Sequence, residues 1–197
     1  MSGAAALPAD PNAAAPKPLR LVLVFIDGLS RLDGWLGAAC LVALTTLMLA
    51  NIVTRALSNV VLWLPADIPV AWEYSSYLMA ATFTFGGAMT LRAGGHIRVS
   101  LLLAHVPPGA RRALEIVSAL LGAAFMGFLA YGMVKFTWAS FSRGQTSYAS
   151  DTPVWLPQAV VAFGMVLLTL QLVARAVQAV FGLPLEDHRM RVAALAE

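Results

Sequence analysis

The chain has 197 residues, of which 59% are hydrophobic and only 12% are charged, and its mean hydropathy is +0.76. Soluble domains carry about 25% charged residues, so this composition excludes a water-soluble globular protein and is typical of a membrane protein. The net charge of +3 comes from scattered residues, and no Lys/Arg run with interleaved aromatic residues predicts a nucleic-acid partner.

The N-terminal region divides into two parts. Residues 1–18 are rich in Ala and Pro with almost no large apolar side chains, so we expect a disordered cytoplasmic tail that cannot offset its own ordering entropy. Residues 19–32 begin like a signal peptide, but Asp27 and Arg31 follow and no small-residue cleavage site is present. This second part is too short to cross a membrane and too apolar for a free loop. We therefore predict an interfacial helix that leads into the first span.

Four uncharged apolar runs follow, each close to the roughly 20 residues that cross the hydrocarbon core of a bilayer. They predict transmembrane helices at about 34–55, 72–92, 113–136 and 153–175. The charged residues at the ends of the runs are Asp33 and Arg55, Glu73 and Arg92, Glu115 and Lys135, and Asp151 and Arg175. The runs are continuous rather than alternating, which indicates helices and not strands. The predicted fold is an all-α membrane domain over residues 19–182 with a cytoplasmic tail at 183–197.

The start of the fourth span carries local signals for a helix N-terminus. Asp151 or Thr152 can cap the first turn, while Pro153 stands where its missing N–H does no harm. Pro157 is expected to bend the helix one turn later.

The distribution of basic residues predicts the orientation. Ten of the thirteen Lys and Arg residues would share one side of the membrane with the two termini and the middle loop, namely Lys17, Arg20, Arg31, Arg92, Arg98, Arg111, Arg112, Arg175, Arg189 and Arg191. Only Arg55, Lys135 and Arg143 would lie on the other side. The positive-inside rule then places both termini in the cytoplasm. Four of the five Trp residues fall at the outer boundary, where indole rings favour the interface.

The sequence offers no catalytic or cofactor-binding motif. His96, His105 and His188 all lie outside the four spans, so haem ligation between facing helices is not expected, and Cys40 alone gives neither a disulfide nor a metal site. We therefore expect no cofactor, no metal and no enzymatic activity. None of the four runs contains a charged residue, whereas a chain that moved ions itself would bury an ionisable group near mid-depth. This pattern indicates a supporting role beside a larger transport protein.

The most distinctive segment is 92–102, which reads RAGGHIRVSLL. Its two adjacent glycines can adopt positive φ and end the second span sharply. The basic residues that follow can anchor the chain to lipid phosphates or form a docking surface for a partner subunit, and the sequence leaves both interpretations open. Glu73 also has two interpretations. Its carboxylate can be favoured by the N-terminal dipole of its helix, or it can pair across a subunit seam or with Arg55 or Arg143.

With these features the chain resembles the DctQ-type small membrane subunits of tripartite ATP-independent periplasmic (TRAP) transporters. The matching features run in order through residues 51–164, and they are Asn51 with Arg55, Trp72-Glu73, the 92–102 segment, Thr146, the run Pro153-Val154-Trp155-Leu156-Pro157-Gln158, and Gly164. Tyr74 departs from the pattern, because the family often has a second acidic residue after the Trp-Glu pair.

The resemblance implies a three-part importer in the bacterial inner membrane. A periplasmic substrate-binding protein would deliver an organic acid, a large membrane subunit would transport it with sodium, and this chain would support the large subunit. The candidate contacts with the large subunit are Arg55, Glu73, Arg92, His96 and Arg98, and the candidate contacts with the binding protein are Asp67 and Arg143. Membrane lipids are the remaining partner. The alternative interpretations are a membrane anchor subunit of a redox or other membrane enzyme, and a small transporter that works alone.

Cysteine labelling tests the predicted orientation. With Cys40 replaced, Ser147→Cys is expected to react with an impermeant thiol reagent in intact cells, whereas Ser100→Cys is not, because the charge distribution places position 147 outside and position 100 inside. Permeabilised cells provide the control, since both cysteines then become accessible. Labelling of position 100 in intact cells with protection of position 147 would reverse the orientation.

Overall fold

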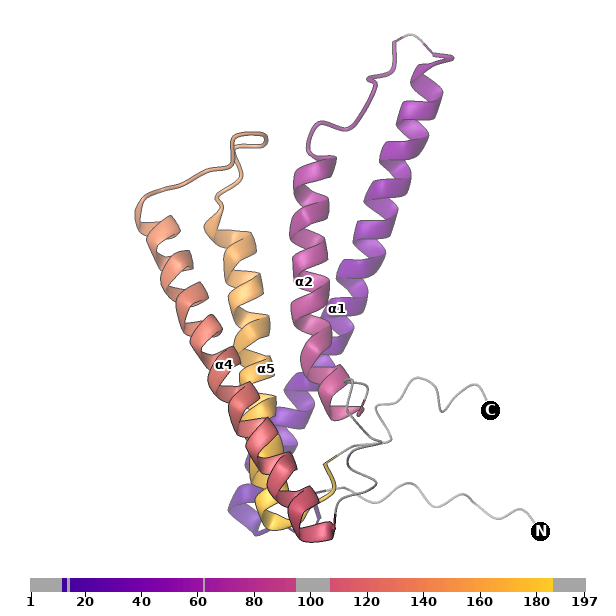
Figure 1. The fold of residues 1–197 in the computed structure, drawn as a ribbon. Coiled ribbons are helices and arrows are strands. Elements are labelled where there is room, and N and C mark those ends of the chain that lie inside the picture. The colour runs from indigo at the N-terminus through magenta and orange to yellow at the C-terminus, as the bar shows by residue number, and fades with distance from the viewer. Residues whose placement is uncertain (1–11, 14, 62, 95–106, 186–197) are drawn as a thin grey trace, which may run out of the picture.

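The structure is a computed structural model that describes residues 12–13, 15–61, 63–94 and 107–185. In this part of the chain the regular structure consists of four α-helices (Figure 1). They are α1 (Lys17–Ser58), α2 (Ala71–Arg92), α4 (Pro108–Ser142) and α5 (Trp155–Phe181). The all-α architecture expected from the uncharged runs is confirmed.

Helix α1 is longer than the sequence predicted. It runs without interruption for 42 residues, about 63 Å at the usual rise per residue, so the predicted interfacial helix at 19–32 and the first span are one element. The separation was wrong because residues 19–58 include no proline that would break the helix. The single proline within α1, Pro18, lies in the first turn, where its missing N–H has no helical partner to lose.

Part of the expected N-terminal tail packs against the helices. Asn12 is buried, with 1% of its surface exposed, and its side-chain amide donates a hydrogen bond of 2.7 Å to Oδ2 of Asp27. The tail prediction therefore extended too far along the chain for this residue. Residues 1–11 and 14 lie outside the described residues.

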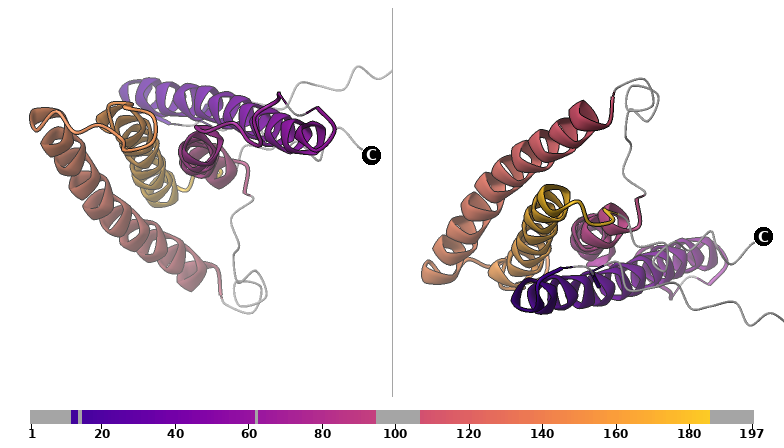
Figure 2. Two further views of the ribbon diagram at one scale, coloured as in Figure 1. Left: turned by 90° about the horizontal axis from the view of Figure 1, so that it is seen from above. Right: turned by 90° about the horizontal axis from the view of Figure 1, so that it is seen from below.

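The four helices form two antiparallel hairpins, α1 with α2 and α4 with α5, which meet through α2 and α5 and through α1 and α5. The N-terminal ends of α1 and α4 and the C-terminal ends of α2 and α5 gather at one end of the molecule, here called the closed end. At the opposite, open end the helices spread apart, and loops 59–70 and 143–154 connect them (Figures 1 and 2). These are the two loops that the sequence places together on one side of the membrane.

Glycines allow the helices to approach closely. A Cβ on Gly37 of α1 would lie 3.1 Å from the backbone N of Gly86 in α2, and one on Gly164 of α5 would lie 2.8 Å from Cβ of Thr84 in α2. Small residues at such contacts are typical of helix packing in membranes, where close backbone approach replaces the hydrophobic effect.

Three of the described helices, α1, α4 and α5, are long and apolar enough to cross a membrane. Helix α2 has 22 residues but carries more polar side chains. Its threonine hydroxyls are satisfied within the helix, as Thr82 donates to the carbonyl of Leu78 at 2.8 Å and Thr90 donates to that of Gly86 at 2.6 Å. Such internal bonding keeps the polar groups of a helix compatible with an apolar environment.

Helix α5 begins later than predicted. It starts at Trp155, and its N-cap residue Val154 provides no side-chain cap, so the cap predicted at Asp151 or Thr152 was wrong. The reason lies in the preceding loop, where Thr146 and Pro153 form an antiparallel bridge and Asp151 adopts a positive φ of 53°. The loop therefore closes on itself before the helix begins.

The glycine contact between α5 and α2 generates a test of the packing. Gly164→Ala is expected to lower the stability of the folded chain by about 1–3 kcal/mol, because the new methyl group must displace Thr84 and its backbone. The matched control is Gly132→Ala in α4, where nothing lies within 4 Å, and it should be neutral or stabilising by up to about 1 kcal/mol. Thermal unfolding in detergent measures both, and equal midpoints for the two variants would contradict the packing.

Candidate functional site

A layer of buried polar and charged side chains fills the closed end of the bundle. Its members come from all four helices and from the segment before α1, and each is less than 9% exposed. We call this set the buried polar layer, and it consists of Asn12, Asp27, Ser30, Asp33, Arg92, Glu115, Gln171, Arg175 and Gln178.

The central contact of the layer joins α1 to α2. Nη2 of Arg92 donates to Oδ2 of Asp27 at 3.0 Å, and Nε of Arg92 lies 3.0 Å from Oδ1 of the same carboxylate in an ion-pair contact that is not aligned as a hydrogen bond. Two nitrogens of the guanidinium group thus face the two oxygens of one carboxylate. This geometry belongs to arginine, since a lysine ammonium cannot present such a fork.

Neutral side chains complete the coordination of this ion pair. Nη1 of Arg92 donates to Oε1 of Gln178 and to the carbonyl of Pro184, both at 3.1 Å. The amide of Gln178 in turn donates to Oδ1 of Asn12 at 3.0 Å, and Asn12 donates to Asp27. The hydrogen bonds form a closed circuit through the N-terminal segment, α1, α2 and α5.

A further neutral contact joins α1 to α5 directly. The hydroxyl of Ser30 donates to Oε1 of Gln171 at 3.0 Å, and both side chains are buried. Two turns before Ser30 on α1, Leu23 packs with Ala174 and Leu183 in a small apolar cluster. Polar and apolar contacts therefore bind the two hairpins together at the closed end.

A second ion pair joins α4 to α5. Nη2 of Arg175 lies 3.0 Å from Oε2 of Glu115, and the two side chains are 7% and 8% exposed. Nη1 of Arg175 reaches the carbonyl of Leu91 in α2 at 3.5 Å. Arg112 of α4 also caps α5, because its Nε donates to the carbonyl of Ala179 at 2.9 Å.

A cavity of about 300 Å³ adjoins this second ion pair. Its lining combines the charged pair with the Ser118 hydroxyl group and apolar side chains of α2, α4 and α5, namely Leu91, Glu115, Ser118, Ala119, Met126, Leu168, Leu172 and Arg175. Within the described residues, no group of three or more His, Cys, Asp or Glu side chains is placed to hold a metal ion.

Four charged residues at the ends of the predicted spans belong to the buried polar layer. Asp33, Arg92, Glu115 and Arg175 mark the ends of the predicted spans, yet the structure places all four inside the bundle rather than in loops. The spacing of the buried α1 residues Leu23, Asp27, Ser30 and Gly37 is helical and indicates that Asp27 shares a face with the core. The sequence therefore indicates that Asp27 is buried, but it does not indicate that Arg92 is its partner, because Arg92 lies 65 residues away.

The residues predicted to contact a large subunit differ in their exposure. Arg92 does not fit this role, because it is 1% exposed and bound within the chain. His96 and Arg98 lie outside the described residues. Arg55 is exposed in the last turn of α1. Glu73 is half-buried, and its Oε1 accepts a hydrogen bond of 2.6 Å from Tyr77 on the same helix rather than pairing with an arginine.

The open end presents the two loops that hold the other predicted contacts. Asp67 is half-buried in loop 59–70, and Arg143 is exposed at the C-cap of α4. Loop 59–70 is held to α1 because Oδ1 of Asn51 accepts a hydrogen bond of 2.8 Å from the backbone N–H of Ile68. This contact gives the buried Asn51 of the sequence motif a structural role.

Loop 143–154 is connected to α2 at the same end. The hydroxyl groups of Tyr74 and Thr152 are 2.8 Å apart and share a hydrogen bond. Tyr74 is the residue at which the sequence departs from the family pattern, and here its phenol joins the two hairpins outside the buried polar layer. Tyr148, further along the loop, is fully exposed.

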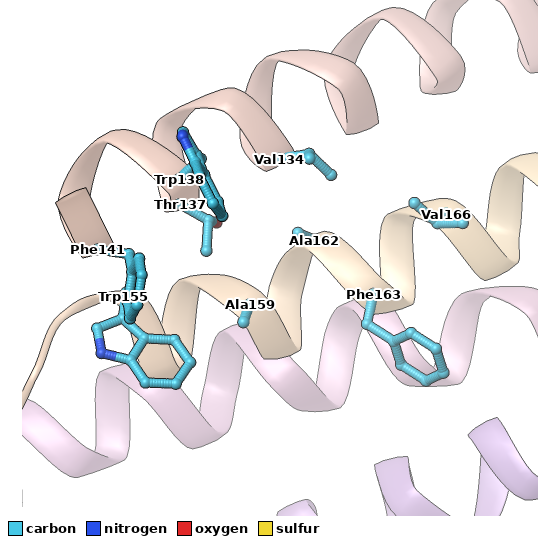
Figure 3. A pocket seen from close by; sticks show the side chains of 9 residues that line it. All are labelled: Val134, Thr137, Trp138, Phe141, Trp155, Ala159, Ala162, Phe163 and Val166. Atoms are coloured by element: carbon cyan, nitrogen blue, oxygen red, sulfur yellow. The ribbon is translucent and has the colours of Figure 1, made fainter.

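An apolar groove of about 590 Å³ lies between α4 and α5 toward the open end (Figure 3). Alanines line its α5 side, and aromatic side chains lie around them. The lining residues are Val134, Thr137, Trp138, Phe141, Trp155, Ala159, Ala162, Phe163 and Val166. Phe141 and Trp155 meet edge to face with ring centroids 5.4 Å apart. This surface can be covered only by lipid or by apolar protein.

Comparison with known proteins gives a consistent result. Residues 44–182 match the model of the family described as tripartite ATP-independent periplasmic transporters, DctQ component. Over 159 residues the chain is 26% identical to the ectoine TRAP transporter small permease protein TeaB of Halomonas elongata, an alignment that covers 80% of this chain and 79% of TeaB. No solved structure matches the chain at a significant level.

The buried ion pair between α1 and α2 generates a test of the layer. Asp27→Asn is expected to destabilise the fold by about 3–5 kcal/mol, because it leaves the Arg92 guanidinium buried without a countercharge. The double variant Asp27→Leu with Arg92→Met removes both charges and should recover most of the loss. Denaturant or thermal unfolding in detergent measures the difference.

The matched control for this test is Arg55→Met, which neutralises an exposed arginine of the same hairpin and should change stability by less than about 0.5 kcal/mol. If Asp27→Asn is no less stable than Arg55→Met, the ion pair does not support the fold.

Proposed function

The chain belongs to the DctQ family of small membrane subunits of TRAP transporters, and from this premise we propose that it supports a large membrane subunit in sodium-coupled, binding-protein-dependent uptake of an organic acid. The match over residues 44–182 carries this proposal. The family is a transporter component, which agrees with the prediction that the chain is not an enzyme. Multiple apolar helices and the TRAP permease relative make it a multi-pass protein of the bacterial inner membrane.

A supporting role fits the positions of the buried charges. In the part of the chain that the structure describes, the buried Asp, Glu and Arg side chains lie at the closed end, and both buried arginines are paired. Toward the open end, the outward-facing residues are mainly large and apolar. The described helices thus contain no ionisable path from one end to the other. We assign transport of the solute and of sodium to the large subunit.

The proposed topology has four spans with the closed end in the cytoplasm. Helix α2 would be the fourth span, since 22 residues are enough to cross the hydrocarbon core and its Thr82, Thr84 and Thr90 hydroxyl groups bond within the helix. Burial of Arg92 and Arg175 removes two positive charges from the cytoplasmic surface. Eight basic residues still remain on that side against three on the other, so the positive-inside rule still favours the closed end in the cytoplasm.

The proposed contact with the large subunit uses apolar helix surface. The groove between α4 and α5 has an aromatic and alanine lining that an apolar helix or lipid can cover. Glu73 and the exposed Arg55 are polar candidates at the open end, and His96 and Arg98 are candidates in the segment between α2 and α4. Membrane lipids would cover the apolar surfaces that the large subunit leaves free.

The proposed contact with the periplasmic binding protein lies on loops 59–70 and 143–154. These loops carry Asp67, Arg143 and the fully exposed Tyr148. The Tyr74 to Thr152 hydrogen bond and the Asn51 to Ile68 hydrogen bond fix both loops on the helix ends. A surface held in this way can dock a partner without first being ordered.

Reconstituted transport tests the proposal. Vesicles that contain the large subunit and this chain are expected to take up solute only when the binding protein and a sodium gradient are present. Arg143→Glu should lower uptake several-fold at limiting binding protein, because charge complementarity acts mainly on the association rate. Raising the binding-protein concentration should restore uptake, and co-purification with the large subunit should be unchanged.

Uptake that proceeds equally well without this chain would overturn the supporting role. Unchanged uptake and unchanged salt dependence in Arg143→Glu would instead move the docking surface to another part of the complex.

A further inference from the structure

One buried carboxyl group takes no part in the ion pairs of the closed end. Asp33 lies on α1 with 0% of its surface exposed, and neither of its carboxylate oxygens has a hydrogen-bond partner among the residues that the structure describes. Asp33 lies six residues after Asp27 on the same helix. Its burial makes it a member of the buried polar layer, but it is not part of the hydrogen-bond circuit around Arg92.

The charges of the layer do not balance if every group is ionised. The buried acids are Asp27, Asp33 and Glu115, and the buried bases are Arg92 and Arg175. Each arginine is already committed to another carboxylate, Arg92 to Asp27 and Arg175 to Glu115, each at 3.0 Å. An ionised Asp33 would therefore add one negative charge that no buried arginine neutralises.

The other contacts of both arginines are also occupied. Nη1 of Arg92 is shared between Gln178 and the carbonyl of Pro184, and Nη1 of Arg175 faces the carbonyl of Leu91. Neither guanidinium can turn to Asp33 without giving up its present carboxylate. A rearrangement would only transfer the unpaired charge to Asp27 or Glu115.

The Asp33 side chain has no hydration shell from bulk solvent, because 0% of its surface is exposed. At the next residue, Gly34, a Cβ would collide with the thioether sulfur of Met89 in α2, and at Gly37 it would meet the backbone of Gly86 at 3.1 Å. Helices α1 and α2 are thus in close contact at Gly34 and Gly37, which follow Asp33 on α1. An isolated carboxylate in such a place costs several kcal/mol, and the group avoids this cost by binding a proton.

We infer that Asp33 is a proton-binding site of the folded chain and that its carboxyl group carries a proton at neutral pH. With this proton the buried polar layer contains two ion pairs and no net charge. The inference depends on the burial and the contacts of this chain alone, so it does not rest on the proposed transport function.

A metal cation is the competing ligand for a buried carboxylate. A hard cation such as Ca²⁺ needs six to eight oxygen ligands, and Mg²⁺ also demands a complete octahedral shell. The amide oxygens of the layer, on Asn12, Gln171 and Gln178, each already accept a hydrogen bond. A proton needs no such shell, which is why the geometry favours it.

Infrared spectroscopy of the full-length chain in lipid bilayers tests the inference. At neutral pH the wild-type chain is expected to show the C=O stretching band of a protonated carboxyl group, and this band should shift when aspartate is labelled with ¹³C. Asp33→Asn, which mimics the neutral acid in shape and charge, should abolish the band and leave the thermal midpoint unchanged.

Asp27→Asn is the matched control on the same helix. It should lower the thermal midpoint, because Arg92 loses its countercharge, while the infrared band of Asp33 remains. If Asp33→Asn fails to fold, the isotope-labelled wild-type chain still decides the question, since the labelled band reports any protonated aspartate directly.

Two results would overturn the inference. The first is a wild-type spectrum in which no labelled carboxylic acid band is present at neutral pH, which would mean that Asp33 is ionised. The second is a carboxylate band that Asp33→Asn removes and that shifts with added sodium, which would identify a cation site instead of a proton site.

Discussion

The arrangement of the helices depends on the buried ion pair between Asp27 and Arg92. A guanidinium with 1% exposure is tolerable only where its countercharge and its remaining donors are satisfied, and here Gln178, Asn12 and the carbonyl of Pro184 complete that environment. The circuit touches α1, α2, α5 and the segment before α1, so none of these elements can shift without breaking a buried polar contact. The helices gather at this end and spread apart at the other because the strong directional contacts are concentrated here.

Away from the layer, packing depends on shape instead of polarity. Gly37 and Gly164 bring α1 and α5 close to α2, and the aromatic and alanine groove between α4 and α5 remains open to apolar material. Hydrogen bonds at the open end fix the loops rather than the helices, as between Asn51 and Ile68. The closed end thus determines how the helices are arranged, while the open end displays exposed loops.

The sequence predicts the helices well and their contacts poorly, for physical reasons. Uncharged runs of membrane-spanning length identify α2, α4 and α5, because hydropathy is a local property. The continuity of α1 across Asp33 is not predicted, because a charged residue at the edge of an apolar run indicates a boundary, whereas the structure buries Asp33 inside the helix bundle. The partner of Asp27 is 65 residues away, and no local pattern encodes such a distance. Family resemblance identified the class of protein, but it also suggested a partner contact for Arg92 that the internal ion pair already occupies.

The two ion pairs have a consequence for how the chain enters a membrane. Asp27 pairs with Arg92 inside the first hairpin, and Glu115 pairs with Arg175 inside the second. The hydrogen bonds of Gln171 and Gln178 with the first hairpin have at least one neutral partner, as in Ser30 with Gln171. Each hairpin therefore contains the carboxylate that neutralises its own buried arginine. Insertion of the hairpins one after the other would never expose an unpaired guanidinium to lipid. Their later association then forms hydrogen bonds in which at least one partner is neutral, such as Arg92 with Gln178, and brings glycine-lined helices into close contact.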